Sequence, residues 1–248
     1  MKNRISLIIA FTILVWSVTY LPYENANGSV VSDVAPLLQG NVHQKNQILF
    51  QDDYSSDAGW TQIGTTVTVN SPSFPGVVYF NNAQGGVSSI EERVYKQLPT
   101  TLPAHKWSSD FTYEYTPSSI PTFRIFALTP SNNDPQDQST TIQIVHGNFA
   151  GDNQLAAWVG PAGTATPGIP ISANTQYYVT LEKNNNLLTL KIFSDSGRTQ
   201  QIAGSPAALD IKGMDFSNLN YLQHDGCKYC GESRSITAQI DNMIIFAH

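Results

Sequence analysis

Apolar and polar residues alternate with a period of two through much of the chain. The clearest example is residues 107–116, where four aromatic side chains share one side and polar residues occupy the other. An α-helix would distribute the aromatic residues around its axis, whereas a strand gathers them on one face. They are Trp107, Phe111, Tyr113 and Tyr115. We therefore predict a β-strand with one buried, aromatic face.

The same alternation marks further segments as strands, and residues that favour turns separate them. The predicted strands are 65–69, 77–80, 123–128, 141–145, 155–159, 176–183, 187–193 and 235–246. Asparagine tolerates positive φ, so Asn184-Asn185-Asn186 predicts a hairpin between two of them. In the last strand the even positions from Ile236 to Phe246 are apolar, interrupted by Asn242. A pattern compatible with a short helix is confined to residues 89–96.

About ten short strands with turns between them predict an all-β fold, an antiparallel two-sheet jelly-roll sandwich. A single open sheet of that width could not cover both of its faces. No internal boundary divides the strand region, so we predict one domain over residues 48–248, long enough to bury a core.

The first residues have the pattern of an export signal. A basic start at Lys2 and Arg4 precedes an uncharged run over residues 5–21, shorter than the ~20 residues that span a bilayer comfortably. Small residues before position 29 predict that residues 1–28 are a signal peptide cleaved after Gly28, with an uncleaved N-terminal anchor as the alternative. Residues 29–47 lack periodicity and are predicted to be a linker or arm. We therefore expect a secreted or cell-surface protein.

Composition and charge narrow the range of partners. Charged residues make up 13% of the chain, the formal net charge is −6, and no basic cluster is present. Because Lys and Arg patches bind phosphate backbones, nucleic acid is not an expected partner. We also expect no membrane contact beyond the possible N-terminal anchor. Asn, Gln, Ser and Thr fill the polar positions, which suits a surface facing water or sugar hydroxyls.

Cys227 and Cys230 are the two cysteines of the chain. In an oxidising compartment, a Cys-x-x-Cys pair with no third cysteine is predicted to form a disulfide. The alternative is a zinc site, in which His224 would be a third ligand and a fourth would be needed.

The order of these elements resembles the concanavalin A-like lectin and glucanase superfamily, including laminin-G-like domains. Four features carry the resemblance: Phe50-Gln51-Asp52-Asp53 with Trp60, the run 107–111, the hairpin 177–193, and Ile240-Asp241-Asn242-Met243-Ile244. It covers residues 48–248 and implies a concanavalin A-like jelly roll. Because this fold hosts lectins, adhesion modules, hydrolases and lyases, the fold alone leaves the activity open.

The resemblance also implies that the first and last strands are neighbours that share a structural calcium ion. Asp52, Asp53 and Asp241 lie at the two ends of the predicted domain. Carboxylates brought together there would repel one another unless a cation lay between them. The alternative is that all three are solvated residues at strand ends.

Aromatic side chains stack on the C–H faces of sugar rings, and amides or charged groups bind their hydroxyls. Most aromatic residues at strand period belong to the core. Tyr178 is the better candidate platform, since it lies opposite Tyr177 and Val179. The candidate ligand-binding residues are Trp60, Trp158, Tyr178 and Tyr221 as platforms, with Asn220, Gln223 and Arg234 as polar groups.

An enzyme is the rival interpretation, either a hydrolase or a polysaccharide lyase on the same fold. The Glu-x-Asp-x-x-Glu signature of the retaining glucanases is missing, and Glu91 and Glu92 would point to opposite faces of a strand. Residues 143–146 resemble the Gln-x-His strand of alginate lyases, with Arg93 upstream. Their spacing departs from that family, and its tyrosine motif is missing.

We therefore predict a non-catalytic extracellular or cell-surface module that binds glycan or a surface or matrix protein, with no catalytic residue assigned. A third interpretation is a structural surface or matrix subunit. Its arm, residues 29–47, would then add a strand to a neighbouring molecule.

Overall fold

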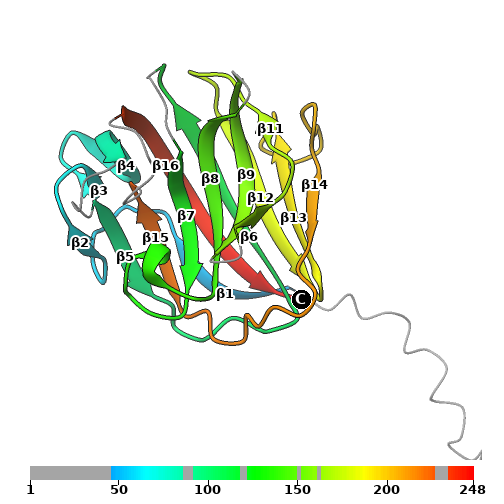
Figure 1. Cartoon of the computed structure of the whole chain (residues 1–248). Coiled ribbons are helices and arrows are strands. Elements are labelled where there is room, and N and C mark those ends of the chain that lie inside the picture. Colours follow the sequence, from blue (N-terminus) through cyan, green and yellow to red (C-terminus); the bar gives the residue numbers. More distant parts are fainter. Residues whose placement is uncertain (1–45, 86–91, 118–121, 150–151, 161–162, 227–233) are drawn as a thin grey trace, which may run out of the picture. The chain divides into compact units, whose positions relative to one another are not determined.

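A computed structural model describes residues 46–85, 92–117, 122–149, 152–160, 163–226 and 234–248. These residues form two antiparallel sheets of eight strands each, which lie face to face (Figure 1). The first sheet has the order β14 (Ala207–Asp210), β13 (Leu187–Phe193), β12 (Tyr177–Asn184), β6 (Lys106–Tyr115), β16 (Arg234–Ala247), β4 (Phe74–Gly85) and β3 (Val67–Ser71), with β1 (Gln47–Asp52) paired to β16. The predicted all-β two-sheet sandwich is confirmed.

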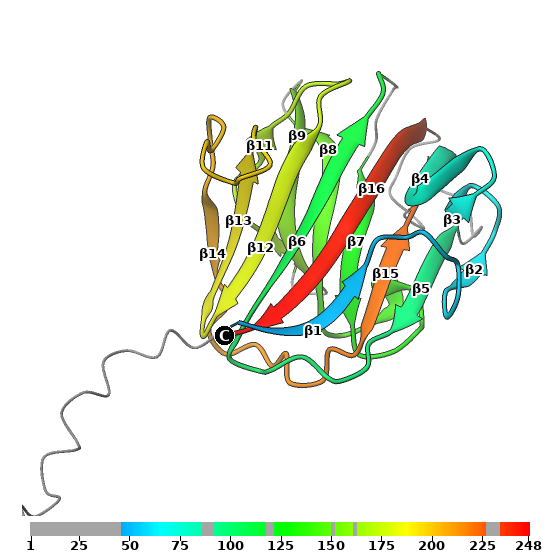
Figure 2. The same cartoon turned by 180° about the vertical axis from the view of Figure 1, so that it is seen from behind.

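The second sheet lies in front in Figure 1, and Figure 2 shows the first sheet from its outward side. The strand order of the second sheet is β10 (Thr164–Ala165), β9 (Asp152–Gly160), β8 (Thr141–Phe149), β7 (Phe123–Thr129), β15 (Tyr221–Asp225), β5 (Arg93–Gln97) and β2 (Thr61–Ile63), with β11 (Ile169–Pro170) paired to β9. Helix within the described ranges is limited to one 3₁₀ turn, η1 (Pro135–Asp137). No helix in those ranges has the length and apolar character needed to cross a membrane.

The core lies between the two sheets and is built from the alternating inward residues of both. On β6 the four aromatic residues expected to share a buried face are all buried. Phe111 of β6 stacks on Phe126 of β7, with ring centroids 5.6 Å apart and an interplanar angle of 11°. Because these strands belong to different sheets, the pair joins the two inner faces. Burying each such side chain contributes about 1.5–3 kcal/mol.

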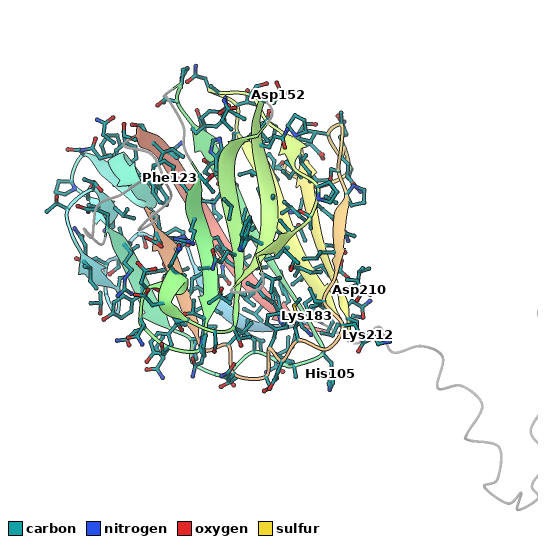
Figure 3. The ribbon with its side chains drawn as sticks, viewed as in Figure 1. His105, Phe123, Asp152, Lys183, Asp210 and Lys212 are labelled. Carbon is teal, nitrogen blue, oxygen red and sulfur yellow. The ribbon has the colours of Figure 1, made fainter. Side chains whose placement is uncertain are left out.

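The predicted hairpin at residues 184–186 joins β12 to β13. Asn184 pairs with Leu187, and Asn185 takes the positive φ of 52° that the turn requires. At this end of the sheet Lys183 is buried, and its ammonium donates to the carbonyls of Ala104 and Asn185. Burial lowers the pKa of Lys183. Figure 3 shows Lys183 near His105, whose carbonyl accepts from the Asn185 N–H at 2.6 Å.

The short helix with which the pattern of residues 89–96 is compatible is not formed in the part that the structure describes. Residues 93–97 form strand β5, which pairs with β2 on one side and β15 on the other. Val94 is buried in the core and Tyr95 points outward. Pairing with two neighbouring strands therefore outweighs the local pattern.

The last strand, β16, changes phase at a β-bulge. Ile240 is buried before the bulge, whereas Met243 and Ile245 are buried after it. Asn242 has φ 55°, and the register with β6 shifts between Asp241 and Ile244. The extra residue of the bulge changes which positions face the core, from even-numbered residues before it to odd-numbered residues after it. The apolar even positions of this strand therefore do not share one face to its end.

This bulge predicts unequal effects for two neighbouring substitutions. Met243→Ala should lower the free energy of unfolding by about 2–5 kcal/mol, because it opens a cavity in the core. Ile244→Ala should cost no more than about 1 kcal/mol, since that side chain is only half-buried. Urea denaturation of both variants measures the difference. Equal losses, or a larger loss for Ile244→Ala, would show that the strand keeps a single alternation.

Candidate functional site

The ligand-binding residues expected from the sequence do not converge on one site. Trp158 lies on the outward face of the second sheet, Tyr178 on that of the first, and Trp60 in the loop before β2. Tyr221 is half-buried on β15 and contacts Tyr95 edge-on, with ring centroids 6.4 Å apart. The Arg234 side chain lies outside the described part of the structure.

The outward face of the second sheet is partly covered by the connection between β7 and β8 (Figure 1). Gln223 is fully buried there, and its amide donates to the Thr129 hydroxyl at 2.8 Å and the Asn133 carbonyl at 2.9 Å. Arg93 donates to the Asn132 carbonyl at 2.6 Å and to Gln223 Oε1 at 2.9 Å. Gln223 and Arg93 thus hold this connection on the sheet.

Asn220 precedes β15, and its backbone links the neighbouring segments. Its N–H donates to the Thr129 carbonyl at 3.0 Å, and its own carbonyl accepts from the Leu98 N–H at 2.8 Å. The main chain of Asn220 therefore continues the pairing of the second sheet.

The residues that suggested a lyase face different sides of the second sheet. His146 points into the core, where Nδ1 lies 2.5 Å from the Tyr113 hydroxyl and its ring contacts Tyr115 edge-on. Burial lowers the pKa of His146 to about 3, so the ring is neutral at pH 7. Gln143 lies three residues away on β8, and its amide donates to the Thr141 hydroxyl. Residues an odd number apart point to opposite faces of a strand.

Trp60 and Asp52 tie the end of β1 to β5. Asp52 accepts from Trp60 Nε1 at 3.0 Å and pairs with the Lys96 ammonium at 2.8 Å. It also accepts from the Tyr54 N–H at 2.8 Å. The Lys96 ammonium lies 5.5 Å from the centroid of the Trp60 ring. Asp52 therefore already has a cation and two further donors, all from this chain.

His224 is buried beside this cluster, and both of its ring nitrogens have partners. Nδ1 lies 2.9 Å from the Ile125 carbonyl and Nε2 lies 3.0 Å from the Tyr54 hydroxyl. Burial lowers the pKa of His224 to about 4. This geometry leaves no ring nitrogen for the alternative zinc site. Cys227 and Cys230, including their predicted disulfide, lie outside the described residues.

Asp53 and Asp241 are close enough to interact electrostatically. Asp53 is exposed and accepts from the Ser55 N–H and hydroxyl, whereas Asp241 accepts from the N–H and the amide of Asn242. Partial burial raises the pKa of Asp241, and the negative charge of Asp53 adds to the rise. Across the described ranges, no three His, Cys, Asp or Glu side chains gather closely enough to hold a metal ion.

The outward face of the first sheet carries a row of residues that the sequence analysis missed. The strand register places Thr68, Tyr79, Gln239 and Glu114 side by side on β3, β4, β16 and β6. Tyr79 lies between the buried residues Val78 and Phe80, so period two directs it outward. That alternation was the signal in the sequence that could have identified it.

This row borders a groove of about 190 Å³. Phe74 and Tyr79 stack at one side of it, with ring centroids 3.4 Å apart and an interplanar angle of 14°. Gln239 donates from its amide to Glu114 Oε2 at 3.2 Å. The groove is lined by Phe74, Tyr79, Glu114, Tyr115, Thr116, Thr237, Ala238 and Gln239.

Phe74 reaches this face because the β3–β4 hairpin is irregular. Residues five apart on a regular strand would point to opposite faces, as Phe74 and Tyr79 would. Gly76 between them has φ 73°, and the register shifts between Val69 and Ser71. The irregular stretch turns the Phe74 ring onto Tyr79.

A second cavity of about 300 Å³ lies at the end of β9. Val159, Met214 and Phe216 supply its apolar surface, and Asp215 is its one carboxylate. It includes none of the ligand-binding residues expected from the sequence. The groove on the first sheet therefore offers the richer polar and aromatic chemistry.

Comparison with known proteins gives matches at the level of structure. No protein-family model matches the sequence, and no curated protein matches it. The GH43 protein BlXynB from Bacillus licheniformis is similar over 80% of this chain, with a TM-score of 0.55 and 12% identity. The match covers 39% of that protein, so this chain corresponds to less than half of its length.

Two further structures match most of both chains. The CBM2 module of the evolved Dit of Lactobacillus casei BL23 phage J-1 has a TM-score of 0.52 at 12% identity, covering 82% of this chain and 97% of that one. The exoplasmic/lumenal domain of VIP36, in its Ca²⁺/Man3GlcNAc-bound form, has a TM-score of 0.52 at 8% identity, covering 82% and 88%. The domain has the concanavalin A-like fold. The resemblance seen in the sequence is thereby confirmed for the concanavalin A-like sandwich, and its ligand is a separate question.

Proposed function

We propose that this concanavalin A-like domain is a non-catalytic module that binds glycan through the groove on the outward face of its first sheet. The observation that supports this most directly is the stacked pair Phe74–Tyr79 beside the hydrogen-bonded pair Gln239–Glu114. Aromatic rings offer an apolar platform for the C–H face of a sugar, while a carboxylate and an amide bind its hydroxyls.

The groove is organised before any ligand arrives. The Gln239 amide is held by Glu114, and the Tyr79 ring is held by Phe74. Side chains that are already fixed lose less conformational entropy on binding, which favours affinity. An open groove of this kind suits a ligand that lies on the surface of the sheet.

The number of carboxyl groups that line the groove favours glycan binding over glycan hydrolysis. Glycoside hydrolases generally use two carboxyl groups that flank the bond to be cleaved. Glu114 is the one acidic residue among those that line the groove. The similarity to the VIP36 domain with Man3GlcNAc bound supports a glycan as the class of ligand. Such a module would meet its ligand outside the cytoplasm, in the compartment that the predicted export signal implies.

Calcium is a second part of the proposal, and it rests on Asp53 and Asp241. Asp52 already pairs with Lys96, so a cation would bind between the other two carboxylates. The VIP36 match in a Ca²⁺-bound form supports this ion. Hard cations of this type take oxygen ligands from carboxylates, carbonyls and water.

We expect EDTA to lower the melting temperature of the protein by a few degrees, about the shift that a loss of 1 kcal/mol produces. Asp53→Asn should remove that sensitivity to the chelator. Differential scanning calorimetry with EDTA, and with EDTA plus excess Ca²⁺, makes the comparison. An unchanged melting temperature in the wild-type protein would exclude a stabilising calcium ion.

Substitution of the aromatic platform tests the proposed groove. Tyr79→Ala should weaken glycan binding at least about tenfold, or about 1.4 kcal/mol, because the stacking surface is lost. Tyr95→Ala is the matched control, since Tyr95 is also half-buried and outward-facing but lies on the second sheet. A broad polysaccharide panel followed by titration calorimetry measures both variants. Equal affinity of Tyr79→Ala and the wild-type protein would place the binding site elsewhere.

A further inference from the structure

We infer that the binding face extends across the first sheet to a second platform at Tyr178, so that the ligand is a neutral glycan chain rather than a single terminal sugar. This inference rests on the proposed function of the groove. It adds a second subsite, a minimum ligand length and a charge preference.

The register of the first sheet places Tyr178 beyond the groove. Glu114 and Thr112 are two residues apart on β6, so both point outward, and Thr112 pairs with Tyr178 of β12. Tyr79 on β4 and Tyr178 on β12 are separated by β16 and β6. Three strand spacings give about 14 Å across the sheet, and one step of two residues gives about 7 Å along it. The resulting separation of about 16 Å is longer than a single sugar ring.

Tyr178, like Tyr79, is an outward-facing tyrosine surrounded by polar side chains. The Arg198 guanidinium lies 5.8 Å from the centroid of the Tyr178 ring, and Arg198 Nε lies 3.7 Å from Asp110 Oδ2. Asp110 also accepts from the Thr180 hydroxyl at 2.6 Å. The Tyr178 hydroxyl donates to Gln176 at 3.3 Å. Each of these side chains is exposed or half-buried, so the cluster can contact a ligand.

The loop that carries Arg198 is held in place by one carboxylate. Asp195 accepts from the N–H groups of Thr199 and Gln200, at 3.0 and 2.7 Å, and from the Thr199 hydroxyl at 2.8 Å. Arg198 has φ 52° within this turn. Asp195 thereby fixes the loop from which the guanidinium reaches Tyr178.

The residues between the two platforms are polar and could follow a chain of sugar rings. Gln239 and Glu114 extend from the groove, and Asp241 lies in the next row towards β12, where its neighbour Thr112 is buried. Several hydroxyl-binding groups therefore lie along the diagonal that joins Tyr79 to Tyr178.

The charge of this face favours a neutral ligand. Glu114 and Asp110 contribute two carboxylates, whereas Arg198, the cation beside Tyr178, already pairs with Asp110. A uronate or sulfate group placed among these carboxylates would be repelled and would lose its hydration. The surface thus discriminates against anionic polysaccharides.

The experiment is titration calorimetry of the full chain with cello-, manno- and xylo-oligosaccharides, each from disaccharide to hexasaccharide. In the series that binds, we expect affinity to rise with length until the chain reaches Tyr178. Tyr178→Ala should lower the affinity for the hexasaccharide about tenfold and leave the affinity for the shortest binding oligomer unchanged. Tyr178→Phe keeps the ring and should retain the gain, while Tyr79→Ala should weaken every length. Oligogalacturonides should bind at least tenfold more weakly than the neutral series.

The second subsite, the charge preference and the proposed function would each be contradicted by a different result. Affinity that is independent of length, or a gain that persists in Tyr178→Ala, would exclude the second subsite while leaving the groove intact. Tight binding of oligogalacturonides would contradict the charge argument. Normal binding by Tyr79→Ala, or no binding of any neutral series, would contradict the proposed function itself.

Discussion

The structure depends on the exclusion of water from between its two sheets. Phe111 and Phe126 stack across that interface, and most inward positions of the surrounding strands are apolar, with His146 as an exception. Because buried polar groups cost free energy unless they are paired, almost all of the polar chemistry is directed to the two outward faces. The β7–β8 connection partly covers one of these faces, held by Arg93 and Gln223. The outward face of the first sheet carries the groove on which the proposed glycan binding rests.

β16 links this core to the proposed binding face. It pairs with β6, β4 and β1, so it runs through the middle of the first sheet. Its Gln239 contributes to the groove, and the bulge after Asp241 returns Met243 to the core. Because of this one extra residue, β16 packs Met243 in the core and presents the Asp241 carboxylate on the outward face two residues earlier.

Much of the fold could be predicted from the sequence, because period two is a local signal that survives in segments such as 107–116. Strands buried on both faces lack that signal: β15 carries Gln223, His224 and Asp225, which are polar and fully buried. The groove was harder still to predict. Phe74 lies among turn residues, and its contact with Tyr79 depends on an irregular hairpin. The pairing of β4 with β16 brings together residues that are about 160 positions apart, which no local pattern encodes.

A crystal structure of the protein with a bound neutral hexasaccharide tests the central claim most directly. We predict a sugar ring on the Phe74–Tyr79 pair, hydroxyls bonded to Glu114 and Gln239, and a chain that continues towards Tyr178. A sugar bound instead on the outward face of the second sheet, beside Trp158, would contradict it.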